Sequence, residues 1–446
     1  MTTLNPERSS LDDRILETLG RHTLMTGLFI FLVILSVSFF GWGAETDPIQ
    51  PKAPIAPPPA VPQDAAPLAT TATPAETVAP PTATSAEATA SDVPPPATQT
   101  AYQPPVTLPT SRAPEYTPTS SDNDPDPTSP PMIHLLFTGD INPGRCLAQA
   151  ALQSGDFEKP YANVATRLRL ADLTIGSLDG SISDIAAPSP CEINYNLIGP
   201  ARTVEGLSFA GFDVITVATN HAMDCGSLGW RCEGKSMQDT RQNLLAAGIE
   251  PVGIGDTLAQ ARAPVILERQ GVRFAFLGVN AISGDATWAD ETTPGTAPLS
   301  NASLDGVIAD ILAARAKADV VIVLAHWGVE YTDMPQSDQE AWAKGMIAAG
   351  ADLVIGNHPH IAQPVQVLPG QGVVAYALGN FVFDQGTVET KQGLVFEADF
   401  LGSKLFAWRL LPIRINNQFQ PGWANPVEAE SILDRIAVLG KDLPVP

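Results

Sequence analysis

Short runs of apolar, mostly β-branched residues alternate with helix-like segments through the later two thirds of this chain. Residues 320–325 form one such run and are followed by His326, and residues 352–356 form another and are followed by Asn357, His358 and His360. An apolar run that stops abruptly at polar residues is typical of a buried parallel strand. Residues 336–349, between the two runs, have a helical pattern that ends at Gly350, so the unit is βαβ. The pattern places three histidines at one edge of one sheet.

Similar runs predict the rest of an α/β domain over residues 132–425, with 426–446 as a C-terminal segment. After His360 the pattern changes to short strands, which predicts antiparallel or mixed pairing there. The predicted strands are 133–138, 171–176, 212–217, 264–267, 272–279, 364–368, 372–378, 393–400 and 405–413, and the predicted helices are 235–247, 304–316 and one that starts near Cys146.

The first 131 residues have a different pattern. Residues 24–43 contain an uncharged apolar run of about 19 residues, the length that crosses a bilayer. Arg8, Arg14 and Arg21 precede it and only Lys52 follows closely, which predicts a cytoplasmic segment 1–23 and a single-pass anchor in the cell membrane. A cleaved signal peptide is the alternative. Residues 44–131 are rich in Pro, Ala and Thr and predict a disordered linker that carries the domain outside the cytoplasm.

The charge of the chain narrows its possible partners. The formal net charge is −23 at pH 7, and a protein that neutralises phosphates needs Lys and Arg instead. The sequence therefore predicts no nucleic-acid partner, and binding of an anionic polymer would need cations as mediators.

Polar side chains follow five of the predicted strands. Two are carboxylates, one is an amide and four are imidazoles: Asp140, Asp179, Asn220, His221, His326, His358 and His360. Each has an ordinary alternative role, such as a helix cap, a turn or a buried core histidine. Together they form a ligand set for divalent metal, and mixed oxygen and nitrogen ligands suit Mn, Fe, Zn or Co. Two such ions close together could catalyse hydrolysis.

At these residues the chain resembles the CapA family of poly-γ-glutamate capsule biosynthesis proteins, in the calcineurin-like metallophosphoesterase superfamily. The resemblance implies a four-layer α/β/β/α metallophosphatase-like sandwich with a metal site at its top edge. It is carried by six ordered motifs, at residues 139–145, 177–180, 211–226, 325–331, 350–360 and 376–384.

The resemblance also implies roles for single residues. Asp140 and His360 would hold one metal ion, Asp179 would bridge two ions, and Asn220, His326 and His358 would hold the second. His221 would be a general acid or would be oriented through Asp224. Arg145 would clamp an anion, or else simply pair with a surface carboxylate. The family usually has Glu where this chain has Asp179, whose carboxylate reaches one methylene less.

Four cysteines fall in the predicted domain, which is consistent with disulfides in an oxidising compartment. Four cysteines allow three pairings. Because residues 230–234 look inserted relative to the family, we expect Cys225 to pair with Cys232, and hence Cys146 with Cys191. A soft-metal site is the alternative.

Two functions remain open. The ligand set favours a membrane-anchored, metal-dependent hydrolase that acts on a phosphoester or on a γ-glutamyl amide. The anchor, the long linker and the shorter Asp179 instead favour a non-catalytic component that binds or anchors a polymer in a synthesis or export complex.

Overall fold

The computed structural model describes residues 129–192, 194–228, 232–282, 287–368, 370, 372–441 and 443. The predicted cytoplasmic segment, the predicted anchor and nearly all of the predicted linker lie outside these residues. Within the described part of the chain, no helix combines the length and the apolar character that crossing a membrane requires.

The larger of two main sheets is built around β1, which carries Asp140 near its carboxyl end. β1, β2, β5 and β6 are parallel neighbours, and β16, β17 and β18 extend the sheet on the other side of β1 by antiparallel pairing. β15 pairs with the last residues of β1. The bounds are β1 Met132–Ile141, β2 Leu173–Leu178, β5 Val214–Thr216, β6 Glu250–Val252, β15 Asn380–Val382, β16 Gln392–Leu401, β17 Lys404–Ile415 and β18 Pro421–Trp423.

The second main sheet has six strands in the order β13-β14-β12-β11-β9-β8. Its four central strands are parallel and its two outer strands are antiparallel to their neighbours. Two small ribbons, β3–β4 and β7–β10, complete the strands described. The bounds are β8 Val265–Arg269, β9 Val272–Asn280, β11 Val320–His326, β12 Leu353–Asn357, β13 Val365–Val367, β14 Val373–Ala375, β3 Ser181–Ile182, β4 Ile198–Gly199, β7 Ile254–Gly255 and β10 Gly295–Thr296.

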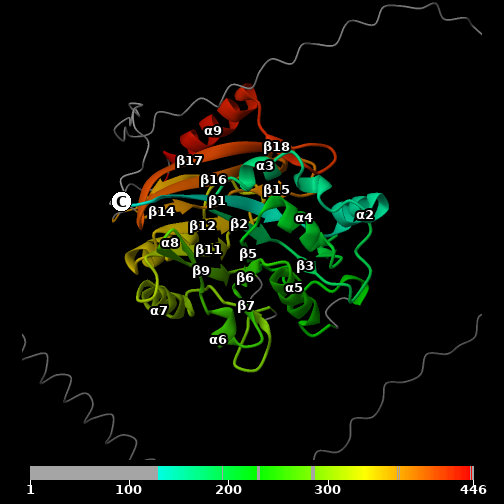
Figure 1. The fold of residues 1–446 in the computed structure, drawn as a ribbon, viewed down its shortest axis with the longest axis horizontal. Coiled ribbons are helices and arrows are strands. Elements are labelled where there is room, and N and C mark those ends of the chain that lie inside the picture. The colour runs from blue at the N-terminus through cyan, green and yellow to red at the C-terminus, as the bar shows by residue number, and fades with distance from the viewer. Residues whose placement is uncertain are drawn as a thin grey trace, which may run out of the picture. The chain divides into compact units, whose positions relative to one another are not determined.

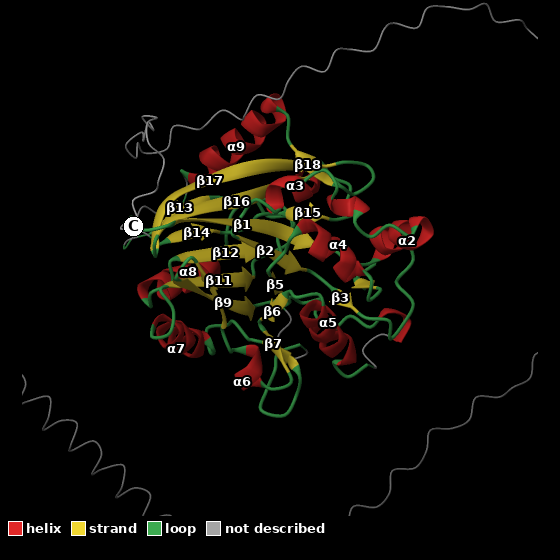
Figure 2. Ribbon diagram, viewed as in Figure 1, coloured by secondary structure: helices red, strands yellow, loops and turns green. Residues whose placement is uncertain are grey.

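Three apolar cores hold these sheets and helices together. One core lies between the sheets, where Phe137 and Phe396 meet Phe274 and Ile322. A second lies between the larger sheet and α2, α3, α4 and α5, and the third between the smaller sheet and α6, α7 and α8. Figures 1 and 2 show the strands in the middle of the domain and the helices around them. The helix bounds are α2 Arg145–Ser154, α3 Ala165–Leu168, α4 Thr203–Ala210, α5 Lys235–Ala246, α6 Leu258–Ala261, α7 Leu304–Arg315, α8 Ser337–Ala348 and α9 Pro426–Gly440.

The C-terminal helix α9 begins at a strong N-terminal signal, because the Asn425 side chain accepts from two backbone N–H groups and Glu428 completes a capping box. Its Ile432 and Ile436 are buried in the core between the sheets, and the helix packs on β17. Residues after 425 therefore contribute to the same core as the sheets.

The fold matches the sequence pattern where apolar runs were long. The βαβ unit β11-α8-β12 is present, with β11 and β12 parallel, and the strands after His360 pair in a mixed manner. The predicted strand 372–378 is too long, because β14 ends at Ala375. Short elements such as β15, β3 and β4 were not predicted, since two or three residues carry no measurable period.

Candidate metal centre

The candidate site lies at the carboxyl ends of strands from both main sheets. Asp140 is the ninth residue of β1, and Asp179 directly follows β2. His326 ends β11 of the other sheet, and His358 and His360 follow β12. Both carboxylates are completely buried and the three histidines are at most 5% exposed. The structure thus brings together side chains that are up to 220 residues apart, as the span from Asp140 to His360 shows.

Asp140, Asp179 and His360 form one compact group at the site. Each offers a ligand atom, and these atoms all lie within 4.8 Å of one another. His360 Nδ1 is 3.6 Å from an Asp140 oxygen, and its Nε2 is 4.0 Å from an Asp179 oxygen. This spacing leaves room for one cation among oxygen and nitrogen ligands.

His326 and Asn220 lie beside this group. His326 Nδ1 is 4.0 Å from Asp140 and its Nε2 is 3.7 Å from Asp179. The Asn220 Oδ1 atom is 2.7 Å from His326 Nε2, so these two atoms bond to one another here. The rings of His326 and His358 are 4.8 Å apart between centroids. The second predicted ligand set is therefore adjacent, but two of its ligand atoms are paired with each other.

Several buried polar atoms at the site have no hydrogen-bond partner in the described part of the chain. They are both carboxylate oxygens of Asp179, Nδ1 of His326 and Nδ1 of His358. A buried carboxylate without a partner is costly, and proteins usually pair such groups or use them to hold a metal. His326 Nδ1 lies 4.0 Å from an Asp140 oxygen, and an Asp179 oxygen lies 4.0 Å from His360 Nε2, so these residues fit a divalent cation.

The backbone around the site is also unusual. Seven non-glycine residues have positive φ in the part of the chain that is described, and four of them belong to this region: Arg145, Tyr331, His358 and His360. His358 has φ of 99° and His360 has φ of 61°. Residues other than glycine seldom adopt these φ angles unless their surroundings enforce them, and residues that do so cluster at functional sites. The turn at Pro359 brings the His360 ring to the carboxylates and the His358 ring beside that of His326 at this cost.

Burial dominates the protonation of the ligand set. Burial, followed by the negative charge of Asp179, raises the pKa of Asp140 well above its usual range. Burial also raises the pKa of Asp179 to about 6. It lowers the pKa of both His358 and His360 to about 3, so these imidazoles stay neutral and keep a lone pair for a cation. A bound cation would favour the charged form of both aspartates.

His221 and Asp224 form a pair at the edge of this group. His221 Nδ1 lies 2.7 Å from Asp224 Oδ2, and a carboxylate can only accept, so Nδ1 carries the proton. Burial lowers the pKa of His221, but the charges of Asp179 and Asp224 and the Asp224 hydrogen bond outweigh it and raise that pKa to about 9. A protonated His221 can donate a proton from Nε2, as a general acid must.

Arg145 lies with His221, His360 and Tyr331 in the wall of a cavity of about 280 Å³. Its guanidinium makes an ion pair with Asp384, whose side chain is only 4% exposed, and donates from Nη1 to the Asn194 carbonyl at 2.8 Å. Of the two roles considered for Arg145, the ion pair is observed, although its partner is buried and not on the surface. A guanidinium has five N–H groups, so donors remain for an anionic ligand in the cavity.

Two residues at the site had no assigned function from the sequence. The Asp384 carboxylate accepts hydrogen bonds from the Arg145 guanidinium and, at 3.0 Å, from the Asn142 side-chain amide. The Asn142 side chain is therefore already bonded to Asp384. Asn380 Oδ1 lies 3.0 Å from His360 Nδ1 and fixes that ring. Both belong to the motif at residues 376–384, which was the available signal, but contacts across 20 residues or more cannot be read from spacing.

The cysteines pair as predicted. Disulfides join Cys146 to Cys191 and Cys225 to Cys232. Cys146 follows Arg145 directly, and Cys225 follows Asp224 directly. Each disulfide is therefore one residue away from a charged side chain of the site.

Comparisons with known proteins agree with the motifs. Residues 134–385 match the family described as bacterial capsule synthesis protein PGA_cap. The chain is 31% identical to the PGA biosynthesis protein CapA of Bacillus subtilis, over 63% of this chain and 71% of that protein. It is 30% identical to the capsule biosynthesis protein CapA of Bacillus anthracis, over 68% of this chain and 70% of that one.

Among solved structures, a phosphatase of Mycoplasma pneumoniae matches 64% of this chain and 94% of its own, at 14% identity and a TM-score of 0.40. A likeness at this level assigns neither a fold nor an activity.

Proposed function

Since this chain belongs to the family of bacterial capsule synthesis proteins, we propose that it is a divalent-metal-dependent hydrolase of capsule polymer metabolism with a metallophosphatase-like α/β/β/α sandwich. The bond it cleaves would be a phosphoester or a γ-glutamyl amide. The relatives are named for capsule or PGA biosynthesis, which supports a capsule polymer or its precursor as substrate.

One observation carries the proposal. The Asp179 carboxylate is fully buried and has no close hydrogen-bond partner among the residues that the structure describes, and its ligand atom lies within 4.8 Å of those of Asp140 and His360. A structural aspartate in a core would be paired with a donor, because an unpaired buried charge is strongly destabilising. A site that keeps this group in place is best explained by a cation.

The residues present divide into ligands and proton donors. A divalent cation held by Asp140, Asp179 and His360 would polarise the scissile oxygen of the substrate and make a water acidic enough to attack at neutral pH. His221 holds a proton on Nε2 and gives it to the leaving group, while Asp224 keeps the imidazole in the required tautomer. The free N–H groups of Arg145 bind an anionic part of the substrate in the cavity.

The number of ions follows from the same contacts. Asp140, Asp179 and His360 are assembled for one ion. A second, held by Asn220, His326 and His358, requires that the bond between Asn220 and His326 open. We propose two positions, of which the first binds more tightly, with Mn, Fe, Zn or Co as candidates.

We further propose that the domain is held on the outer side of the cell membrane by residues 24–43. Two disulfides support an oxidising compartment. The Lys/Arg bias around the apolar run supports the orientation.

The test uses the full chain purified with its native metal content. We expect at least one bound divalent ion per chain, and Mn²⁺-dependent hydrolysis of either an aryl phosphodiester or poly-γ-glutamate. Asp179→Asn should lose the ion and the activity. Asp156→Asn is the matched control, because Asp156 is exposed and uses Oδ1 only to accept backbone N–H groups, which Asn also does. Wild-type protein that binds no metal and cleaves neither substrate class would refute the hydrolase.

Two observations favour a second function. The bond between Asn220 and His326 and the short Asp179 side chain both weaken the second ion position. A non-catalytic component that binds or anchors polymer would tolerate this. Full capsule production in cells carrying Asp140→Ala and His358→Ala would favour that function.

A further inference from the structure

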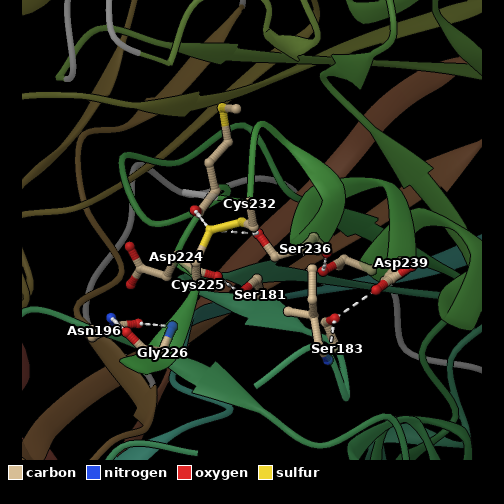
Figure 3. Close-up of a disulfide and its surroundings, with 12 residues drawn as sticks. Ser181, Ser183, Asn196, Asp224, Cys225, Gly226, Cys232, Ser236 and Asp239 are labelled. Carbon is tan, nitrogen blue, oxygen red and sulfur yellow. Dashed lines mark hydrogen bonds between the residues drawn. A yellow bond between two sulfur atoms is a disulfide. The ribbon is translucent and has the colours of Figure 1, made fainter. Parts of the chain in front are cut away.

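Two loops meet beside the His221–Asp224 pair. One contains residues 194–197 and the other residues 224–226. Asn196 joins them through its side-chain amide, because Gly226 N–H donates to Asn196 Oδ1 at 2.9 Å and Asn196 Nδ2 donates to the Gly226 carbonyl at 2.7 Å. Figure 3 shows Asn196 and Gly226 facing each other next to Asp224. A single side chain, that of Asn196, thus binds both the N–H and the carbonyl of Gly226.

Asp224 is held on its other sides as well. The Leu197 N–H donates to Asp224 Oδ2 at 2.6 Å, and the Ser181 hydroxyl donates to the Asp224 carbonyl at 2.6 Å. The carboxylate oxygen bonded to Leu197 is the one that bonds to His221. The direction of the His221 ring therefore depends on where the loop of residues 194–197 places this N–H.

The loop of residues 224–226 has little freedom to compensate. Gly226 has φ of 57°, and a Cβ on it would lie 2.8 Å from the Ala187 carbonyl oxygen. Cys225 is tied to Cys232 by the disulfide drawn in Figure 3. These constraints keep Gly226 opposite Asn196, whose amide gives it both a donor and an acceptor.

We propose that Asn196 is a positioning residue for the proton-donating group, acting through Gly226 and Asp224 on His221. This rests on the proposed hydrolase function. The hydrogen bonds of Asn196 to described residues go to Asn194 and Gly226, and its amide holds the two loops at the spacing that the Asp224–His221 hydrogen bond needs. Asn194, two residues earlier, fixes Arg145 through its carbonyl, so one loop sets the position of both cationic side chains of the cavity.

Truncation of the amide tests this role in the full chain. In Asn196→Ala, Gly226 loses both partners, and we expect kcat with Mn²⁺ to fall about 10- to 100-fold, with KM and bound metal unchanged. Asn416→Ala is the matched control, because Asn416 also uses both ends of its amide, accepting from Gln418 and Gln420 and donating to the Gln420 side chain. It should keep wild-type kcat.

A double variant separates positioning from general loosening. In a His221→Ala background, Asn196→Ala should cause no further loss of kcat, since its effect is exerted through His221. Losses that multiply, or full activity of Asn196→Ala alone, would overturn the proposal.

A spectroscopic measurement keeps the test independent of catalysis. The wild-type chain should show a downfield proton resonance for the His221 Nδ1–H that is bonded to Asp224, identified by its absence in His221→Ala. Asn196→Ala should lose this resonance and Asn416→Ala should keep it. If the wild-type chain is inactive on every substrate, the hydrolase fails, while this resonance still decides whether Asn196 positions His221. Its survival in Asn196→Ala would overturn the proposal.

Discussion

The unpaired carboxylate of Asp179 makes a prediction about stability at the level of one residue. A cation that binds only the folded chain stabilises it by about 2.7 kcal/mol when its concentration is 100 times its dissociation constant. We expect a chelator to lower the unfolding temperature of the wild-type chain and added Mn²⁺ to restore it. Asp179→Asn should respond to neither, because the group that requires the cation is gone. Thermal unfolding followed by circular dichroism measures both.

In that experiment the Asp156→Asn control should respond to chelator and Mn²⁺ as the wild type does. A wild-type chain whose unfolding temperature ignores both additions would contradict the metal centre.

His134 gives a second prediction at this scale. Hydrogen bonds that the His134 ring donates to Asp399 and Glu397 of the adjacent strand raise the pKa of His134 to about 9. Since this is above the unfolded value of 6.5, the stabilisation is complete below about pH 6.5 and disappears as the pH rises through 9. His134→Gln should therefore reduce the free energy of unfolding by about 1 kcal/mol at pH 6, allowing for solvent screening, and by almost nothing at pH 10.

Urea unfolding of the two proteins at pH 6, 8 and 10 checks this, because the difference between them cancels the other titrating groups. An equal difference at all three pH values would show that His134 contributes through packing and not through its charge.

At the scale of elements, the close contact between β1 and β15 shapes the site. A Cβ on Gly139 would lie 1.8 Å from the Gly379 carbonyl oxygen, and that oxygen accepts the Asp140 N–H at 2.9 Å. We expect Gly139→Ala to destabilise the fold by about 3 kcal/mol and to reduce metal binding, since the two strands must separate at Asp140. Chemical denaturation and metal analysis measure the two effects.

Gly345→Ala serves as the control for that change. Gly345 lies inside α8, and the nearest atom to its Cβ would be 3.7 Å away. Alanine should stabilise the helix by up to about 1 kcal/mol. Equal stability of Gly139→Ala and Gly345→Ala would contradict the close contact between β1 and β15.

The strands also show which parts of the fold could be predicted from the sequence. Long apolar runs such as β9, β11 and β12 were predicted within one or two residues, because burial on both faces leaves a continuous signal. β15 was missed, although it pairs with β1 at Asp140 and begins with Asn380. Its three residues are specified by contact with β1, and contacts between distant segments leave no local period.

At the scale of the whole molecule, the disulfides set part of the stability. They close loops of 45 and 7 residues in sequence separation. Chain entropy then predicts a loss of about 4 kcal/mol for Cys146→Ser with Cys191→Ser, and about 2.5 kcal/mol for Cys225→Ser with Cys232→Ser. Guanidinium unfolding of each double variant measures these values. The reverse order would show that strain or native contacts, and not loop length, determine the contribution of each disulfide.

The sequence predicted which polar residues would lie near one another, but not the contacts between them. The family motifs named Asp140, Asp179, His326, His358 and His360, and all five converge. The sequence could not show that Asn220 bonds to His326, or that Asp384 rather than a surface carboxylate receives Arg145. Such pairings depend on the distance between loops, which only the packed sheets determine.

Asp140 and Asp179 come from one main sheet, and His326, His358 and His360 from the other. An ion among them would cross-link two sheets that otherwise contact each other through apolar side chains. Sliding of one layer against the other by a fraction of an ångström would spread the ligands. Large-to-small substitutions in the core between the two sheets, far from any ligand, should therefore weaken metal binding before they unfold the protein.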